Sequence, residues 1–432
     1  MSQVTADYAA FLASKRREQG TLGPTNVPIS AQLYDWQAAI TRWAVRKGRA
    51  AIFADCGLGK TYMQAAWAKA LNVRTLILAP LCVAEQTVRE AAQLGMTVNY
   101  ALDGQSDSGQ FVITNYERID KFDPADYDAV ILDESSILKS FDGKTRTKLI
   151  ETFQRTKYRL CCTATPSPND ISELANHAEF LGLMTRSEFL ATWFVHDDAG
   201  WRMKGHAVQP FYRWMASWAM ALRKPSDIGF DDDRFTLPAL RFHEVVTESE
   251  HAGDSLFPEL GLKGITGRLR ARKSSMGSRV AQIEQITANG LQWVLWCGLN
   301  AESEALAESI PDAVEVCGDD TYAEKIAAVQ GFIAGDIRVL VSKVKILGFG
   351  LNLQHCHQMG FVGLSDSYEQ YYQAIRRCWR YGQKHPVDVH IVVSDAERGI
   401  VANVQRKEAD ANAMNTGLIE HMRDFEREEV CA

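Results

Sequence analysis

The sequence predicts an α/β fold with two parallel sheets, each flanked by helices. Short apolar runs alternate with stretches of helical character in two separate regions, from 31 to about 166 and from 291 to about 394. Continuous apolar runs between helices are typical of strands that are buried on both faces. A chain of 432 residues is also long for a single core. We therefore expect two α/β domains joined by a linker.

The elements follow from the apolar runs in order. The first region is expected to place strands at Ala50–Phe53, Thr75–Ala79, Gln110–Thr114, Ala129–Leu132 and Leu160–Thr163, and the second at Trp293–Cys297, Ala313–Val316, Val339–Ser342, Gln358–Gly363 and Val387–Val393. The domain limits expected from this pattern are an N-terminal arm at 1–30, a first domain at 31–240 with a helical extension from about 168 to 240, a linker at 241–285, a second domain at 286–405 and a C-terminal helix at 406–432.

Composition limits the class of protein. Hydrophobic residues make up 46% and charged residues 23%, as in soluble globular proteins. The net charge of −7 excludes a global basic field, so any nucleic acid would be held in a local groove. Nine cysteines without a Cys-x-x-Cys pair fit a reducing compartment. With no signal peptide and no apolar run long enough to cross a bilayer, we expect a cytoplasmic protein without membrane contact.

The segment Ala54–Thr61 is the most informative stretch. It follows an apolar run and precedes an Ala-rich helical stretch, which is the context of a phosphate-binding loop. Gly57 and Gly59 let the backbone curl around Leu58 and point N–H groups inward, and the helix beginning near Lys60 adds its positive end. Lys60 can reach the β- and γ-phosphates, and the Thr61 hydroxyl can ligate Mg²⁺. The alternative is a chance Gly-x-Gly-Lys-Thr sequence in a loop.

Two further strand ends carry polar groups. Asp133-Glu134 closes one apolar run, so Asp133 can hold Mg²⁺ and Glu134 can orient and deprotonate the attacking water. The alternative is an acidic pair at a turn. Thr163-Ala-Thr165-Pro follows the next run, and its hydroxyls could couple the nucleotide site to a second site. Here the alternative is plain strand termination.

Three side chains outside these strand ends suit a nucleotide. The amide of Gln37, just before the first strand, can pair with the edge of adenine, or it can pack at a helix start. Arg377 and Arg380 are three residues apart, so on a helix they would share a face and could clamp phosphates. The alternative for the two arginines is a solvated basic helix face.

The order of these pieces resembles the superfamily-2 helicase-like ATPases, specifically their Swi/Snf-type branch. The matching motifs are Ala54–Thr61, Leu78–Pro80, Val112–Glu117, Asp133–Ser136, Thr163–Pro166, Gly348–Leu353 and Gln373–Gln383, with Leu222–Lys224 and Leu237–Pro238 resembling a branch signature. The ending Arg380-Tyr-Gly-Gln383 is the most specific for the branch. Cys56 in the loop, and Arg376 and Trp379 beside the two arginines, depart from the common branch sequence and resemble compact phage and prophage members.

The resemblance implies two tandem RecA-like domains with ATP in the cleft between them. Its site residues carry over by position. Gln37 would read adenine, Lys60 and Thr61 would bind phosphate and Mg²⁺, and Asp133 and Glu134 would be metal anchor and base. Gly350 would join the nucleotide site, Arg377 and Arg380 would complete it, and Thr163, Thr165 and Gln373 would couple it to DNA. Pro80, Thr114 and Asn352 would contact DNA.

The implied function is a motor that couples ATP hydrolysis to movement on, or remodelling of, mainly double-stranded DNA. Phage or bacterial replication, recombination or repair is the expected setting, with the protein a monomer or weak oligomer. One alternative is a strand-separating helicase, which would need a wedge such as a β-hairpin, and no segment of the sequence suggests one. Another is an ATP-gated DNA clamp that recruits a nuclease or a replication protein.

Overall fold

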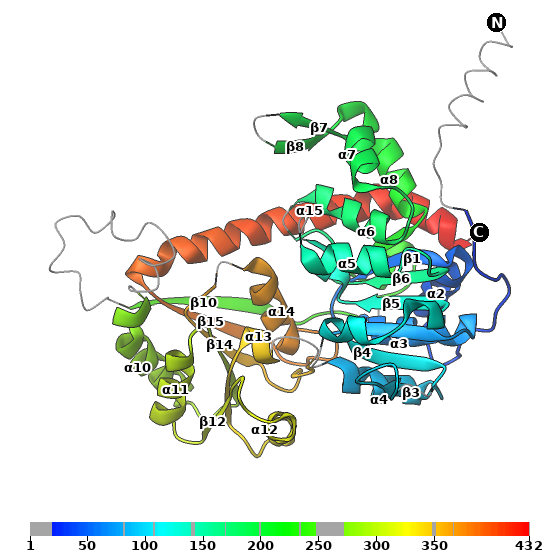
Figure 1. Cartoon of the computed structure of the whole chain (residues 1–432). Helices are drawn as coiled ribbons and strands as arrows, with labels where there is room; N and C mark the ends of the chain where they lie inside the picture. The colour runs from blue at the N-terminus through cyan, green and yellow to red at the C-terminus, as the bar shows by residue number, and fades with distance from the viewer. Residues whose placement is uncertain are drawn as a thin grey trace, which may run out of the picture. The chain divides into compact units, whose positions relative to one another are not determined.

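The computed structural model describes residues 20–80, 83–106, 109–139, 143–168, 170–197, 200–232, 235–247, 272–347, 351–365 and 367–431. The chain forms two compact units. Unit 1 comprises Met1–Asp232 and Ala411–Ala432, and unit 2 comprises Asp233–Asp410 (Figure 1). Each unit contains one parallel sheet flanked by helices, which confirms the expected fold class. No helix among the described residues is both long and apolar enough to cross a membrane.

Unit 1 is built on a seven-stranded sheet with the order β3-β4-β2-β5-β6-β1-β9, in which all described pairs are parallel. Its strands are β1 (Arg49–Ala54), β2 (Thr75–Ala79), β3 (Val98–Tyr100), β4 (Phe111–Asn115), β5 (Ala129–Asp133), β6 (Tyr158–Cys162) and β9 (Ala219–Leu222). The helices of this unit before residue 170 are α2 (Asp35–Lys47), α3 (Lys60–Leu71), α4 (Ala84–Gln93) and α5 (Lys144–Thr152). Every residue of β2, β4, β5 and β6 is buried, as expected for strands covered on both faces.

The stretch from 170 to 232 is not purely helical as expected. It contains α6 (Leu174–Phe180), α7 (Arg186–Trp193) and α8 (Val208–Ala216), but also an antiparallel hairpin of β7 (Phe194–Asp197) and β8 (Gly200–Met203). The hairpin extends away from the helices that carry it (Figure 1). Its base is anchored because Phe194 stacks on Phe189 with ring centroids 5.6 Å apart. The hairpin corrects the expectation that the chain offers no such element.

Unit 2 is built on a six-stranded parallel sheet with the order β10-β15-β14-β11-β13-β12. Its strands are β10 (Leu240–Thr247), β11 (Trp293–Cys297), β12 (Ala313–Val316), β13 (Val339–Lys343), β14 (Gln358–Val362) and β15 (Val387–Ser394), and its helices are α10 (Met276–Thr287), α11 (Asn300–Ser309), α12 (Tyr322–Ala334), α13 (Val344–Leu347) and α14 (Tyr368–Cys378). Strand β10 lies in the stretch expected as linker and pairs with β15 along its whole length.

The C-terminal helix α15 (Arg398–Cys431) begins before the expected residue 406 and belongs to both units. Leu418, Ile419 and Met422 are buried in the hydrophobic core of unit 1. The Glu426 carboxylate accepts the backbone N–H of Ala221 in β9 at 2.6 Å. Because β9 pairs with β1, this part of the helix supports the edge of the sheet next to the phosphate loop.

Glu426 generates a pH-dependent prediction about stability. Burial, its largest cause, raises the pKa of this carboxyl well above the usual 4.5, Asp227 raises it further, and Arg423 opposes the shift. The unfolded chain therefore releases this proton more readily than the native protein, so native stability is lost as pH rises above about 4.5. Glu426→Gln should raise Tm at pH 8 by about 2–4 °C, which corresponds to about 1 kcal/mol.

The gain from Glu426→Gln should shrink toward pH 4.5. Glu428→Gln, on an exposed position of the same helix, is the matched control and should leave Tm unchanged. Thermal denaturation followed by circular dichroism measures both variants. A Glu426→Gln effect that is equal at pH 8 and pH 4.5 would show that the charge of Glu426 does not matter.

Candidate nucleotide site and comparisons with known proteins

The loop between β1 and α3 has the geometry of a phosphate cradle. Gly57 and Gly59 have φ angles of 85° and 73°, in the left-handed region that glycine adopts without strain. Helix α3 begins at Lys60, directly after this turn. The Lys60 ammonium donates to the carbonyl oxygens of Ala54 at 2.9 Å and Asp55 at 3.4 Å, so it lies over the loop. Backbone donors, a helix start and one cation therefore meet at the carboxyl end of β1.

Gln37 in α2 lies directly against this loop. Its amide nitrogen donates to the Leu58 carbonyl at 2.9 Å, and its amide oxygen accepts the N–H of Tyr34 at 3.1 Å. A Cβ atom added to Gly59 would stand 2.5 Å from the Gln37 nitrogen. The φ angle therefore favours glycine at position 59, and a larger residue would also displace the Gln37 amide from its contact with Leu58. The adenine contact of Gln37 stays a prediction, and in this structure its amide braces the loop.

Asp133 ends β5, two strands away from β1 in the sheet, with β6 between them. Its carboxylate accepts the amide N–H of Gln64 at 2.6 Å. Burial is the largest cause that raises the pKa of Asp133 to about 6, and the neighbouring Glu134 raises it too, while Gln64 and Lys60 lower it. The amide oxygen of Gln64 is itself buried and has no hydrogen-bond partner among the described residues. These two side chains thus place buried oxygen atoms near the phosphate loop.

Glu134 has an unusual backbone for a residue with a side chain. Its φ of 52° is in the left-handed region, which costs a non-glycine residue about 1–2 kcal/mol. The Tyr116 hydroxyl fixes the preceding residue by donating to the Asp133 carbonyl at 2.6 Å. Strain of this kind persists where the surroundings enforce it, and it is concentrated at functional sites. The turn gives Glu134 a different direction from Asp133, consistent with separate tasks.

The threonines after β6 connect to this acidic pair. The Thr163 hydroxyl donates to the Glu134 carboxylate at 3.5 Å, and it accepts the N–H of Thr165 at 3.1 Å. Thr163 is fully buried, and the buried hydroxyl of Thr165 has no partner among the described residues. The structure therefore brings Thr163 to Glu134, as a coupling role requires. Whether the contact couples ATP to DNA stays a prediction.

Two residues of this site escaped the sequence reasoning. Gln64 lies four residues after Lys60 on α3, so the helical period puts both side chains on one face. That spacing is a signal which could have identified it. The other is His177 in α6, whose ring contacts the Ser135 hydroxyl at 3.2 Å. Burial lowers the pKa of His177 to about 3, so the ring is neutral. No local pattern connects residue 177 to the acidic pair.

The two arginines of unit 2 lie together, although not for the expected reason. Helix α14 ends at Cys378, so Arg380 lies beyond it and does not share a helical face with Arg377. Both side chains instead donate to the carbonyl of Leu351, at 3.2 Å from Arg377 and 3.4 Å from Arg380. Arg377 also donates to the amide oxygen of Gln373 at 2.6 Å. Gln373 thus positions Arg377 directly.

The residues expected to contact DNA lie in different environments. Pro80 follows β2 and is half-buried, whereas Thr114 in β4 is fully buried, with a hydroxyl that has no partner among the described residues. Asn352 is exposed, and its side-chain oxygen accepts the N–H of Gln354 at 3.3 Å. Gly350 lies outside the described residues. The DNA contacts of Pro80, Thr114 and Asn352 remain predictions.

The packing of Gln37 on Gly59 makes a sharp prediction. Gly59→Ala should weaken ATP binding by roughly tenfold or more, because the strained φ and the clash with Gln37 each oppose the loop conformation. Gly95→Ala is the matched control, since Gly95 also has a positive φ of 64° but an added Cβ there would stand 3.7 Å from its nearest neighbour, Lys69. Calorimetric titration of ATP into both variants measures the difference. Equal affinity of the two variants would contradict this reading of the loop.

Comparisons with known proteins agree with the two-unit architecture. Residues 27–196 match the SNF2-related domain, and residues 284–382 match the helicase conserved C-terminal domain. A stretch of 112 residues is 26% identical to a protein of Acanthamoeba polyphaga mimivirus named as an ATP-dependent RNA helicase. This stretch covers 24% of the chain and 21% of the viral protein, so the match spans about a fifth of that relative.

Among solved structures, the chain is similar to the SWI2/SNF2 ATPase core of Sulfolobus solfataricus in complex with dsDNA, with a TM-score of 0.43 and 17% identity over 92% of this chain and 95% of that chain. The family assignment depends on the two domain matches, which occur in the order that the motifs predict. The chain belongs to the superfamily-2 helicase-like ATPases of the Swi/Snf type.

Proposed function

We propose that this protein is a DNA-dependent ATPase that uses ATP hydrolysis to move along, or remodel, mainly double-stranded DNA. One observation carries the proposal. Lys60, Asp133 and Thr163 come from the carboxyl ends of β1, β5 and β6, which are adjacent strands of one sheet. The crevice outside the carboxyl ends of parallel strands is where α/β proteins bind ligands. The phosphate cradle, the acidic pair and the Thr163 hydroxyl that contacts Glu134 thus lie at the same edge of the sheet.

The cradle would hold the phosphates of ATP. Lys60, which donates to two backbone carbonyls in this structure, would exchange them for the β- and γ-phosphate oxygens. The N–H groups around Gly57 and Gly59 would donate to the same phosphates. Gln37 already contacts the loop at Leu58, so adenine bound beside it would sense the conformation of the loop.

The donor set at the acidic pair suits Mg²⁺, which prefers oxygen ligands. Asp133 offers a buried carboxylate that already interacts with the Lys60 charge, and Thr61 offers a hydroxyl at the start of α3. When bound, the ion would neutralise charge on the phosphates. Glu134, turned away by its left-handed backbone, would accept the proton of the attacking water. Thr163, which donates to Glu134, would orient this base.

Unit 2 would supply the positive charge that stabilises the transition state of ATP hydrolysis. Arg377 and Arg380 donate to one carbonyl, so the two guanidinium groups are already gathered at one place. Arginines of this kind stabilise the charge of the transition state and are worth roughly 10³–10⁵ in rate. ATP would then be hydrolysed fast only when both units engage it, and alternating grip on DNA would turn each cycle into a step.

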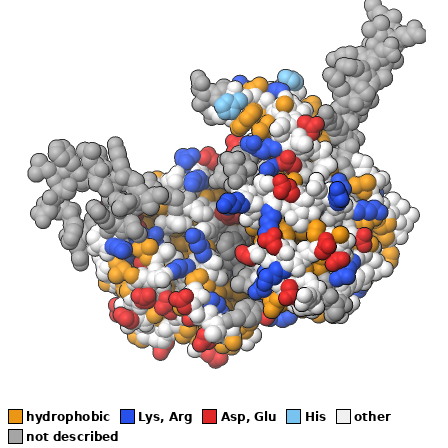
Figure 2. Space-filling model, viewed as in Figure 1, with side chains coloured by type: hydrophobic (Ala, Val, Ile, Leu, Met, Phe, Trp, Pro, Cys, Tyr) orange, Lys and Arg blue, Asp and Glu red, His pale blue; other side chains and the backbone are white. Residues whose placement is uncertain are grey.

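DNA would be held by local contacts rather than by a general positive field. On the face of the molecule in Figure 2, lysine and arginine side chains are interspersed with acidic ones, in keeping with the net charge of −7. Pro80, Thr114 and Asn352 remain the proposed contacts. Binding through phosphates would weaken with salt and depend little on sequence. We place this activity in the replication, recombination or repair of phage or bacterial DNA, because the changes in the motifs resemble compact phage members.

A strand-separating helicase is the second candidate, and the β7–β8 hairpin favours it. The His196 and Trp201 rings lie on paired positions of the hairpin, with centroids 4.9 Å apart, and could stack on an opened base pair. Against this role, the sequence at the end of β7 is Asp197-Asp198, and these carboxylates would repel phosphate. The third candidate, a clamp that recruits a nuclease or replication protein, would hydrolyse ATP without moving DNA.

The base assignment is tested by Glu134→Gln. We expect DNA-stimulated ATP hydrolysis to fall by roughly 10²–10⁴-fold, because the water loses its proton acceptor, while ATP binding persists. Glu151→Gln, at an exposed position of α5, is the matched control and should keep full turnover. Phosphate release measured with and without duplex DNA gives the result. If Glu134→Gln keeps its turnover, Glu134 is not the base.

The three candidate functions give different results on two substrates. A duplex translocase should displace the third strand of a triplex but leave forked DNA intact. A strand-separating helicase should open the fork, and Trp201→Ala should abolish this opening while ATP hydrolysis continues. A recruiting clamp should do neither, although it hydrolyses ATP. Fork opening without triplex displacement would overturn the translocase proposal in favour of the second candidate.

A further inference from the structure

A short 3₁₀ helix follows the acidic pair directly. This helix, η4 (Ser135–Lys139), begins at the residue after Glu134, the proposed base. A 3₁₀ helix of this length has poor hydrogen-bond geometry, and its last carbonyl groups have no partner within the helix. The left-handed backbone of Glu134 adds strain just before it. Contacts from elsewhere in the fold must therefore hold this segment in place.

Two neighbouring side chains of α6 contact the two ends of η4. At its start, the His177 nitrogen Nε2 lies 3.2 Å from the Ser135 hydroxyl. At its end, the Asn176 amide donates to the carbonyls of Leu138 at 2.7 Å and Lys139 at 3.4 Å. Asn176, His177 and Ser135 are each 0% exposed, so water does not compete for these contacts. Helix α6 thus fixes η4 at both ends.

The His177 ring also packs against the strand that leads into the phosphate loop. The ring of Phe53, in β1, meets it edge to face, with centroids 5.2 Å apart and planes at 81°. Phe53 directly precedes Ala54, the first residue of the loop. One buried ring therefore touches both the strand before the phosphate loop and the segment after the proposed base.

The charge state of His177 indicates that it holds its neighbours rather than transferring protons. Burial is the largest cause that lowers the pKa of His177 to about 3, and a hydrogen bond with the Ser135 backbone opposes this shift. A general acid or base works best when its pKa lies near the pH of the reaction. His177 is therefore uncharged at neutral pH, and its contribution comes from contact.

The other side of the acidic pair is held by different residues. The Tyr116 hydroxyl donates to the Asp133 carbonyl at 2.6 Å, and the Thr163 hydroxyl donates to the Glu134 carboxylate at 3.5 Å. Neither contact restrains the backbone after Glu134, which is where α6 acts. A displacement of a reacting group by about 1 Å can cost roughly 10²-fold in rate. A restraint on each side of the turn therefore bears on catalysis.

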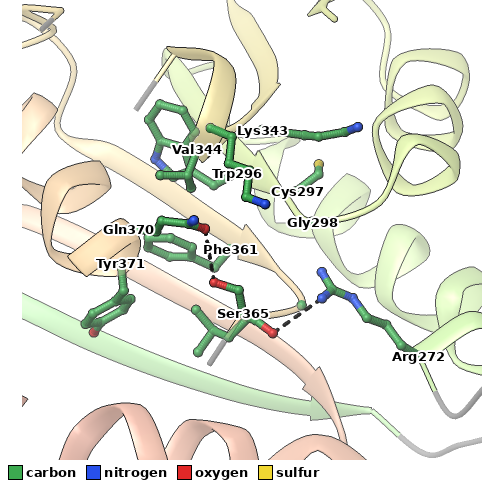
Figure 3. A pocket seen from close by; sticks show the side chains of 13 residues that line it. Arg272, Trp296, Cys297, Gly298, Lys343, Val344, Phe361, Ser365, Gln370 and Tyr371 are labelled. Atoms are coloured by element: carbon green, nitrogen blue, oxygen red, sulfur yellow. Dashed lines mark hydrogen bonds between the residues drawn. The ribbon is translucent and has the colours of Figure 1, made fainter. Parts of the chain in front are cut away.

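Unit 2 has a comparable arrangement at the end of β14. The Arg272 guanidinium donates to the carbonyls of Val362 at 3.2 Å and Leu364 at 3.3 Å, and Figure 3 shows it pointing toward this turn. The buried Glu302 carboxylate accepts from the same guanidinium at 2.6 and 2.8 Å. In both units a side chain from another element thus fixes backbone carbonyls near the end of a central strand.

We propose that Asn176 and His177 are positioning residues for Glu134, because they hold the segment after it and so keep its carboxylate directed at the attacking water. The proposal rests on the proposed function in one respect, which is that Glu134 is the base. It assigns to Asn176 and His177 no contact with ATP. Their loss should therefore lower the rate of hydrolysis and leave the affinity for ATP unchanged.

Two substitutions at position 177 separate hydrogen bonding from packing. His177→Phe keeps a ring against Phe53 but removes the nitrogen at Ser135, whereas His177→Gln removes the ring but supplies an amide that can donate and accept. We expect His177→Phe to lower kcat roughly tenfold, a part of the loss that a full misplacement causes, and His177→Gln to stay within about threefold of the parent. A lower kcat for His177→Gln than for His177→Phe would show that packing matters instead, and would overturn the proposal.

A second pair of measurements tests the route through Ser135. Ser135→Ala is a small change that supplies the test even if His177→Phe does not fold, and it should lower kcat to a similar extent. Combined with His177→Phe it should cause little further loss, since both changes break one contact. Losses that multiply fully would show that the two side chains act separately, and would overturn the proposal.

Asn176→Ala leaves two carbonyls of η4 without their donor and should also lower kcat roughly tenfold. His206→Phe, at an exposed position of the 3₁₀ helix η6 (Gly205–Ala207), is the matched control and should keep the parental kcat. Phosphate release at saturating ATP gives kcat, and calorimetric titration with a non-hydrolysable ATP analogue gives the affinity. Circular dichroism verifies that each variant is folded. Variants of Asn176 and His177 that lose affinity as much as rate would overturn the positioning role.

Glu134→Gln, measured in the same assay, distinguishes this proposal from the proposed function. If Glu134→Gln loses turnover while His177→Phe and Asn176→Ala keep the parental kcat, only the positioning proposal falls. If Glu134→Gln keeps its turnover, the base assignment and the positioning proposal fall together. Turnover is measured with and without duplex DNA. A rate that DNA does not change, but that His177→Phe lowers, would overturn the motor proposal and support the positioning role.

Discussion

The close approach of Gln37 to Gly59 is the contact on which the candidate site depends. The Gln37 amide nitrogen lies 2.5 Å from the position that a Cβ atom would take if another residue replaced this glycine. The same Gln37 amide donates to the Leu58 carbonyl, so it joins the turn after β1 to α2. Lys60 and the start of α3 take their positions from that turn. Helix α2, β1 and α3 therefore act as one element, although the sequence separates Gln37 from Leu58 by 21 residues.

Around this element, the buried polar side chains of the site have specific hydrogen-bond partners. Asp133 is held by Gln64, Glu134 by its left-handed backbone and by Thr163, and Arg377 by Gln373. Buried polar groups are costly when unpaired, so such pairs fix the directions of the side chains. The buried atoms without described partners, on Gln64 and Thr165, lie beside the same acidic pair. A bound ligand or ion could satisfy them, as the proposed binding of ATP and Mg²⁺ would require.

Much of the fold was predictable because its signals are local. All ten expected strands occur, and Thr75–Ala79, Trp293–Cys297 and Ala313–Val316 have the expected limits. Strands β3, β9 and β10 were missed because strands at the edge of a sheet depend on pairing with distant residues. The β7–β8 hairpin was missed because its aromatic residues match a helix equally well. The start of α15 at Arg398 has a local signal that the expected limit of 406 overlooked, because Ser394 and Glu397 form a capping box directly before it.

The residues of the candidate site also fall into two groups, those that local sequence signals identify and those that they do not. Glycines, lysine and paired acids were identified because the phosphate chemistry requires these residue types at these spacings. Gln64 and His177 were not, because their roles arise from contacts across the fold. For Arg377 and Arg380 the pairing was expected but the reason was wrong, since the carbonyl of Leu351 rather than a helix face brings them together. Tertiary contacts can thus replace helical periodicity.

The central claim is that ATP hydrolysis in unit 1 is coupled to duplex DNA. The most direct measurement is the rate of ATP hydrolysis by the full-length protein at one salt concentration, alone and with duplex DNA, single-stranded DNA or RNA of equal length. We expect strong stimulation by duplex DNA and weaker stimulation by single-stranded DNA and RNA. A rate that no nucleic acid changes would contradict it.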